Sequence, residues 1–178
     1  EAEYAKVLAA EPTHPGALNN RAIALYRSGR VEEAEAALRT LIARYPDHAD
    51  GLNNLAAIEL DRGKDAEAEA LARRAIHAAP DAAEAWNNLG LATEAKDVAE
   101  ARRSFERAIE LQPTYWQARM HLGMLLQKTG DPAGAAQALA KAVELSPTDA
   151  ETHLALGRLY AGRVGQPDKA MEHLNAFL

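Results

Sequence analysis

The sequence of 178 residues contains no cysteine, which excludes disulfides, thiolate metal sites and cysteine nucleophiles. Aromatic residues are also scarce, at 5% of the chain, whereas hydrophobic residues together make up 48% and are mainly alanine. This composition disfavours a β-sandwich of aromatic and β-branched residues and favours helices that approach one another closely. No hydrophobic stretch is long enough and uninterrupted enough for a membrane span, so we expect no membrane insertion.

The chain also lacks a basic patch. Its formal net charge is −6, its pI is near 5.5, and its Lys and Arg residues form no cluster. Because nucleic-acid binders concentrate basic residues on one surface, we expect no nucleic-acid partner. The six histidines include no pair with the helical spacing of a zinc site, and no phosphate loop or serine elbow is present. We therefore expect no metal, no cofactor and no catalytic activity.

A regular spacing of prolines is the strongest pattern in the sequence. Successive spacings of 34, 34, 33 and 34 residues separate Pro12, Pro46, Pro80, Pro113 and Pro147. With the third residue after each proline as position 1, repeats begin at Pro15, Ala49, Ala83, Trp116 and Ala150. Position 8 then always carries a small residue: Ala22, Ala56, Gly90, Gly123 or Gly157. Small residues in register predict pairs of helices that cross closely.

Turn and cap residues recur at fixed places in the repeats. Gly29, Gly63 and Gly130 occupy position 15, where a left-handed residue ends the first helix of a pair. Asp131 followed by Pro132 predicts a cap and a first helical turn in the fourth repeat. The residue after each repeat proline predicts the N-cap of the next first helix: Thr13, Asp47, Asp81, Thr114 and Thr148.

The segments Trp86-x-x-Leu89-Gly90 and Leu122-Gly123, with a later Ala, a Phe or Leu, an Ala and a Pro, resemble the tetratricopeptide repeat signature. The resemblance covers nearly the whole chain. It implies an all-α, right-handed α-solenoid of antiparallel helix pairs, whose first helices line most of a concave face. The predicted single solenoid, 1–178, consists of the second helix of a preceding repeat at 1–14, and of repeats at 15–48, 49–82, 83–115, 116–149 and 150–178, the last truncated.

Neither end of the predicted array carries a polar capping element, which solenoids normally need. We therefore expect the native protein to continue in both directions, and the ends of this segment to be capable of end-to-end self-association. The compartment is left open.

Asparagines gather at two adjacent positions of the first helices. Six of the seven occupy positions 5 and 6 of three consecutive repeats: Asn19, Asn20, Asn53, Asn54, Asn87 and Asn88. The position-6 column resembles the asparagine ladder in the tetratricopeptide tracts of O-GlcNAc transferase and kinesin light chain, which implies contacts with the main chain of a client peptide. The alternative is that these amides bond to the next helix of the array. The residues alone leave both interpretations open.

Other candidate groove residues surround this column. His121 replaces asparagine at position 6 of the fourth repeat, and Tyr26 and Met124, with Ile23, Leu60 and Leu91, are predicted to supply shallow apolar pockets. Position 2, where some family members carry the basic residues of a carboxylate clamp, reads Gly16, Asp50, Glu84, Gln117 and Glu151. With Asp61 and Glu94 adding negative charge, we expect a neutral or mildly basic extended partner.

Three functions remain compatible with these features. The first is a non-catalytic scaffold that binds a protein or an extended peptide in its groove. The second is an accessory, substrate-recruiting tract of a larger enzyme such as a glycosyltransferase. The third is a self-assembly module that acts through the solenoid ends.

Overall fold

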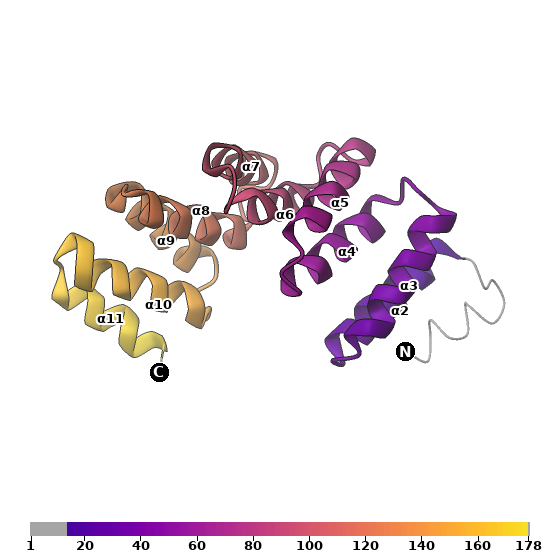
Figure 1. The fold of residues 1–178 in the computed structure, drawn as a ribbon. Coiled ribbons are helices and arrows are strands. Elements are labelled where there is room, and N and C mark those ends of the chain that lie inside the picture. Colours follow the sequence, from indigo (N-terminus) through magenta and orange to yellow (C-terminus); the bar gives the residue numbers. More distant parts are fainter. Residues whose placement is uncertain (1–13, 178) are drawn as a thin grey trace. The chain divides into compact units, whose positions relative to one another are not determined.

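The computed structural model describes residues 14–177, and every regular element among them is a helix (Figure 1). The elements are α2 (Pro15–Arg27), α3 (Val31–Arg44), α4 (Ala49–Asp61), α5 (Asp65–Ala78), α6 (Ala83–Thr93), α7 (Val98–Leu111), α8 (Trp116–Thr129), α9 (Pro132–Leu145), α10 (Ala150–Leu159), a short π-helix η1 (Tyr160–Val164) and α11 (Pro167–Phe177). The all-helical fold class is therefore confirmed. None of the helices in the described range is long and apolar enough to cross a membrane.

The chain divides into two compact units, Glu1–Ala92 and Thr93–Leu178. Below, unit 1 denotes residues 14–92 and unit 2 denotes residues 93–177.

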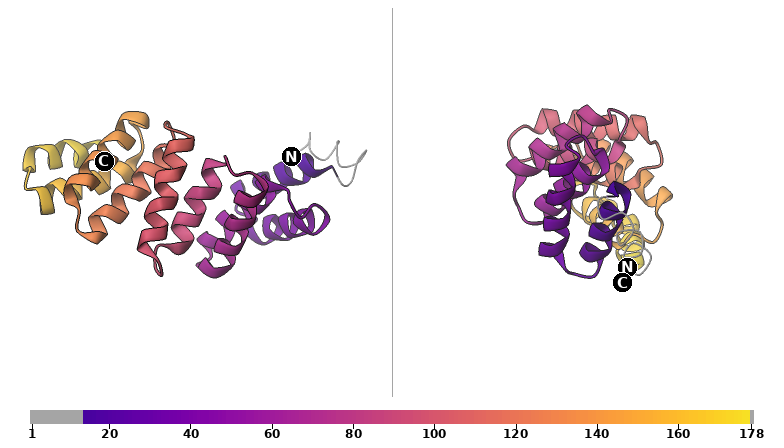
Figure 2. Two further views of the ribbon diagram at one scale, coloured as in Figure 1. Left: turned by 90° about the horizontal axis from the view of Figure 1, so that it is seen from above. Right: turned by 90° about the vertical axis from the view of Figure 1, so that its right-hand side faces the viewer.

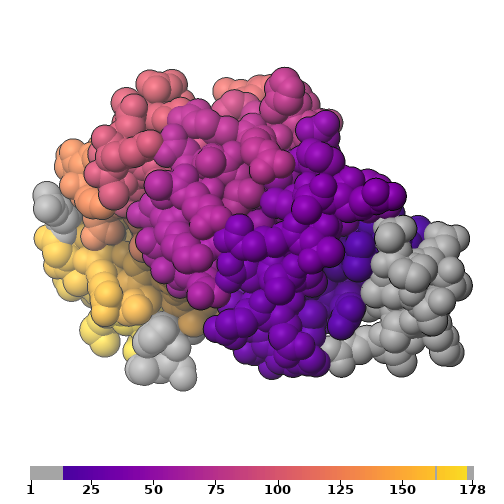
Figure 3. Space-filling model, turned by 45° about the vertical axis from the view of Figure 1, so that its right-hand side comes forward, coloured from indigo at the N-terminus to yellow at the C-terminus, as the bar shows by residue number. Residues whose placement is uncertain are grey.

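Unit 1 consists of two helix pairs followed by α6. Within it, α2 packs against α3 and α4 against α5, each pair joined by a short turn (Figure 2). The pairing follows from the spacing of apolar residues: in α3, Ala34, Leu38 and Leu41 recur on one face and are at most 1% exposed. Figure 3 shows the atoms of unit 1, coloured indigo to magenta, packed against one another on the face in view. Burying each leucine contributes about 1.5 to 3 kcal/mol.

Unit 2 repeats this construction. The pairs are α8 with α9 and α10 with α11, while α7 packs against α8. Its core contains Phe105, Leu139, Leu156 and Leu159, all fully buried.

Two histidines cap helices of unit 1, although the sequence predicts the residue before each of them as the cap. The Nδ1 atom of His48 accepts a hydrogen bond from the Gly51 amide at 3.0 Å, and Nδ1 of His14 accepts from the Ala17 amide at 3.2 Å. Imidazole thereby satisfies a free amide of the first helical turn. The prediction of Asp47 as a cap is wrong, because the chain adds one more residue to the turn before α4 begins.

The same displacement occurs in unit 2. Asp149 caps α10 by accepting from the Thr152 amide at 2.8 Å, and Tyr115 precedes α8 without a side-chain cap. Thr148 and Thr114 are therefore not the caps that the sequence predicts. The predicted cap Thr13 lies outside the described residues.

The turn predictions hold. Gly29, Gly63 and Gly130 have φ angles of 79°, 70° and 89°, which confirms their left-handed conformation. Asp131 caps α9 by accepting from the Gly134 amide at 2.9 Å, and Pro132 begins the helix.

The small residues of position 8 lie where paired helices come closest. A Cβ atom added to Gly123 would lie 2.6 Å from Cγ of Leu139, and Ala22 and Ala56 are completely buried. Larger side chains at these positions would push the helices of a pair apart.

Candidate functional site

The asparagine columns form hydrogen bonds between neighbouring first helices. Nδ2 of Asn54 on α4 donates to Oδ1 of Asn19 on α2 at 2.9 Å. In the same way, Nδ2 of Asn88 on α6 donates to Oδ1 of Asn53 on α4 at 2.8 Å and lies 3.3 Å from the Asn53 carbonyl. The position-6 amides of the second and third repeats thus bond to the position-5 amide of the preceding repeat, as in the second of the two interpretations left open by the sequence.

Burial separates the six asparagines further. Asn19, Asn87 and Asn88 are only 6%, 3% and 8% exposed, so their amides do not lie on an open surface. Asn53 and Asn54 are half-buried, and Asn20 is exposed. The amides that remain accessible to a partner are therefore those at the N-terminal end of unit 1, on α2 and α4.

Two adjoining hollows lie beside these accessible amides. The described residues that line hollow A, of about 560 Å³, belong to α2 and its C-cap: Asn20, Ile23, Ala24, Arg27 and Ser28. Hollow B, of about 250 Å³, lies between α2, α3 and α4 and is lined by Ala22, Ile23, Tyr26, Arg27, Leu38, Asn54, Ala57 and Ile58. The two share Ile23 and Arg27. Of the predicted pocket residues, Ile23 and Tyr26 therefore line real hollows.

Hollow B is apolar at depth and polar at its edge. Ala22, Leu38 and Ile58 are at most 3% exposed, whereas Tyr26 and Asn54 are half-buried. The Tyr26 hydroxyl donates to the carboxylate of Asp61 at the end of α4, which fixes the phenol ring beside the hollow. A buried apolar lining with a few polar groups at the edge is typical of a site that accepts a side chain.

The two candidates of unit 2 have different environments. Met124 is 41% exposed and presents its side chain to solvent. His121 is half-buried, with its ring centroid 5.7 Å from that of Phe105. Burial lowers the pKa of His121 to about 4, against a smaller opposing effect of the Glu94 carboxylate. His121 is therefore neutral near pH 7 and belongs to the packing of α7 against α8.

A repeated contact that the sequence does not reveal ties three first helices to the preceding loop. The position-4 side chain donates to the carbonyl of the repeat proline six residues earlier. Nε1 of Trp86 donates to Pro80 at 2.9 Å, Nη2 of Arg119 to Pro113 at 3.1 Å, and Nε2 of His153 to Pro147 at 3.0 Å. Three chemically different residues thus supply the same N–H donor, so a search for residue identity misses the contact.

His153 also contacts a second histidine. Because its Nε2 donates to a carbonyl, its Nδ1 is free to accept, and Nδ1 of His173 lies 3.1 Å away. The two rings join α10 to α11, and the ring of Tyr160 stacks on His173 at 5.8 Å. Burial and the neighbouring His153 lower the pKa of His173. Within residues 14–177, no group of three or more His, Asp or Glu residues is arranged to hold a metal ion.

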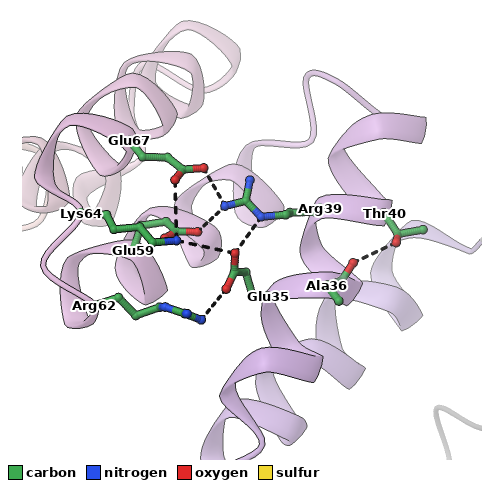
Figure 4. A network of polar contacts seen from close by, with 8 residues as sticks. All are labelled: Glu35, Ala36, Arg39, Thr40, Glu59, Arg62, Lys64 and Glu67. Atoms are coloured by element: carbon green, nitrogen blue, oxygen red, sulfur yellow. Dashed lines mark hydrogen bonds and ion pairs between the residues drawn. The ribbon is translucent and has the colours of Figure 1, made fainter.

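A network of charged side chains covers the junction of α3, α4 and α5 (Figure 4). The carboxylate of Glu59 is completely buried, with Arg39 NH2 2.6 Å from its Oε1 and Lys64 Nζ 2.8 Å from its Oε2. Arg39 also donates to Glu67 and Glu35, at 2.6 and 2.8 Å. The hydrogen bond from Arg39 holds the pKa of Glu35 below its usual range. The paired charges neutralise one another, so this surface offers no free charge to a ligand.

Helical hairpins that repeat every 33 or 34 residues define a class of repeat scaffold, and matches to sequence profiles identify the family. The profile of the tetratricopeptide repeat matches residues 1–49, 19–83 and 94–150, and a second tetratricopeptide profile matches 126–177. The chain belongs to the tetratricopeptide repeat family. No curated protein matches the sequence.

Solved structures share this fold at low sequence identity. TTC0263, a thermophilic tetratricopeptide protein of Thermus thermophilus, matches with a TM-score of 0.80 and 21% identity, covering 92% of this chain and 90% of that one. MamA of Desulfovibrio magneticus RS-1 matches with a TM-score of 0.72 and 20% identity, covering 92% of each chain. YrrB, described as having an unusual peptide-binding site, matches with a TM-score of 0.67 and 21% identity, covering 98% of this chain and 90% of that one.

Proposed function

We propose that the chain is a protein-interaction scaffold that binds an extended segment of a partner along α2 and α4 of unit 1. The role as an interaction scaffold follows from membership of the tetratricopeptide repeat family, whose fold is generally a non-catalytic interaction module. Binding at α2 and α4 is supported by one observation above all: apolar hollow B opens beside accessible amides.

The hollow and the amides suit different parts of a peptide. Hollow B accepts an apolar side chain, whose burial supplies about 25 cal/mol per Å² of apolar surface removed from water. Oδ1 of Asn54 accepts no hydrogen bond from the described residues, and Asn20 has no hydrogen-bond partner among them, so both can pair with the main chain of a guest. The peptide-binding site of YrrB, a protein of the same fold, adds support.

The other predicted site residues divide into three groups under this proposal. Asn19 and Asn53 hold the neighbouring amides in place, and Asn87 and Asn88 lie too deep to touch a guest. His121 and Met124 stay predictions for a separate contact in unit 2. The accessory-enzyme and self-assembly alternatives also stay predictions.

The test uses a phage-displayed library of random linear peptides, panned against the immobilised full chain. Ala57 lines hollow B and is half-buried, so Ala57→Arg places a long side chain in the hollow at little cost to the helix. Ala43→Arg, at an exposed position of α3 that lines none of the described hollows, is the matched control.

We expect the wild type and the control to enrich the same peptides, with a large apolar residue in common, and Ala57→Arg to enrich none of them. Circular dichroism and urea unfolding of the three proteins check that the variants fold alike. Enrichment that survives Ala57→Arg would place the binding surface elsewhere, and the absence of any enriched peptide would contradict the proposal.

A further inference from the structure

The one charged residue among the described residues that line the two hollows is basic. Arg27 lines both, and none of the described residues that line them is acidic. The Arg27 side chain is exposed and has no hydrogen-bond or ion-pair partner between residues 14 and 177. Arg39, Arg62 and Lys64 on the same unit are all paired with carboxylates. Arg27 thus differs from the basic residues of the neighbouring network.

Two of the acidic side chains that the sequence places in the groove, Asp61 and Glu94, have partners of their own. Asp61 accepts from the Tyr26 hydroxyl and lines neither hollow, and Glu94 in unit 2 pairs with Lys128 at 2.9 Å. The ion pair with Lys128 offsets the charge of Glu94, whereas Asp61 keeps its negative charge because the Tyr26 hydroxyl is neutral. Among the described residues that line the hollows themselves, however, the charged side chain is that of Arg27.

Resting on the function proposed above, we infer that the bound segment carries a carboxylate close to its apolar anchor, and that Arg27 selects it. The apolar side chain enters hollow B, and the carboxylate lies at the edge shared by hollows A and B, where a guanidinium donates two parallel hydrogen bonds to it. The partner is therefore an acidic, hydrophobic peptide segment.

A control is needed to separate recognition of a carboxylate by Arg27 from stabilisation of its own helix. Arg27 lies in the last turn of α2, where any basic residue stabilises the negative end of the helix dipole. Arg44 occupies the last turn of α3, is likewise exposed, has no partner between residues 14 and 177, and lines none of the described hollows. Arg44→Gln therefore matches Arg27→Gln in helix position and charge change, without touching the site.

The experiment begins with the peptides enriched by the wild type in the panning described above. The expected consensus has Asp or Glu next to the apolar anchor. One such peptide, and its Glu→Gln or Asp→Asn counterpart, are then titrated by fluorescence anisotropy against wild type, Arg27→Gln and Arg44→Gln. Loss of the peptide carboxylate weakens binding to wild type and to Arg44→Gln by about tenfold, as expected for a charge-assisted hydrogen bond. The same peptide change has little effect on Arg27→Gln.

The outcomes separate the two proposals. One outcome is that apolar peptides bind, that Ala57→Arg abolishes their binding, and that no acidic residue is enriched among them. In that case the scaffold function stands and the role of Arg27 is overturned. Equal losses in Arg27→Gln and wild type on removal of the peptide carboxylate would also overturn it. If no peptide binds at all, both proposals fail.

Discussion

The surface over α3, α4 and α5 in unit 1 and the corresponding surface over α7, α8 and α9 in unit 2 are built at equivalent repeat positions but with different chemistry. In unit 1, Arg39 reaches across to Glu59 and Glu67 on the next hairpin. In unit 2 the equivalents of these two acidic residues are Leu126 and Gly134.

The charges that remain in unit 2 pair along their own helix. Arg102 Nε donates to Glu106 of α7 at 2.8 Å, which raises the pKa of Arg102. The surface stays open as a hollow of about 730 Å³, whose lining includes Arg102, Glu106, Leu126 and Gly134. The same backbone repeat therefore supports a closed polar junction or an open groove, according to which side chains face each other between hairpins.

The largest expected effect comes from removing both cations that flank Glu59. Arg39→Met with Lys64→Met leaves a completely buried carboxylate without a partner, which costs about 3 to 5 kcal/mol of unfolding free energy. Urea denaturation measures the loss. Adding Glu59→Leu, which copies Leu126 of unit 2, should recover most of it. Arg102→Met in unit 2 is the control and should change stability by less than about 1 kcal/mol, because its partner is exposed.

Acid should weaken unit 2 through His121. The folded state holds the pKa of His121 at about 4, below the ordinary value of 6.5, so the unfolded chain takes up this proton first. The contribution of neutral His121 to the free energy of unfolding is fully present above pH 6.5. It is lost as the pH falls toward 4, by up to about 3 kcal/mol. His121→Gln should remove this part of the pH dependence in urea titrations. Parallel pH profiles for wild type and variant would show that His121 titrates as an ordinary exposed histidine.

Steric tolerance at position 8 should also differ between the units. Gly123→Ala in unit 2 forces a Cβ to within 2.6 Å of Leu139 Cγ and 3.3 Å of the Ala135 carbonyl, at a cost of about 1 to 3 kcal/mol. Unit 1 already accommodates alanine at Ala56, and Ala56→Gly should cost about 1 kcal/mol through helix propensity and about 0.8 kcal/mol more through loss of the buried methyl group. Thermal unfolding of both variants makes the comparison. A fully stable Gly123→Ala would mean that α8 and α9 can separate freely.

The smallest effect concerns the contact between position 4 and the repeat proline. Trp86→Phe keeps a six-membered aromatic ring but removes the pyrrole ring with the N–H that donates to Pro80, and loss of this hydrogen bond should cost about 0.5 to 1.5 kcal/mol. Arg119→Met removes the two corresponding bonds in unit 2, which are longer, at 3.1 and 3.3 Å, and should cost less. A cost for Arg119→Met equal to or above that for Trp86→Phe, measured by urea denaturation, would contradict this ranking.

Much of the fold follows from the sequence. The glycines at position 15 require a left-handed turn wherever they stand, and the period of the small residues sets where helices cross. The caps were misplaced by one residue, because imidazole at His48 competes with the carboxylate of Asp47 for the same free amides, and only the course of the turn decides between them.

The candidate site was predictable only in part. Ile23 and Tyr26 were found because apolar residues on the exposed side of an amphipathic helix form shallow pockets. The amide partners of Asn54 and Asn88 lie 35 residues away in the chain, and no local pattern encodes such contacts. That Arg27 has no partner between residues 14 and 177 also depends on the tertiary structure.

The sequence by itself determined that this chain forms repeated helical hairpins of the tetratricopeptide family, since hydrophobic periodicity and turn chemistry act over a few residues. Only the tertiary structure decided which amides are buried, which charges are neutralised and where a hollow stays open. These properties are set by the distance between side chains on neighbouring hairpins, and a change of one residue on either side alters them without disturbing the repeat.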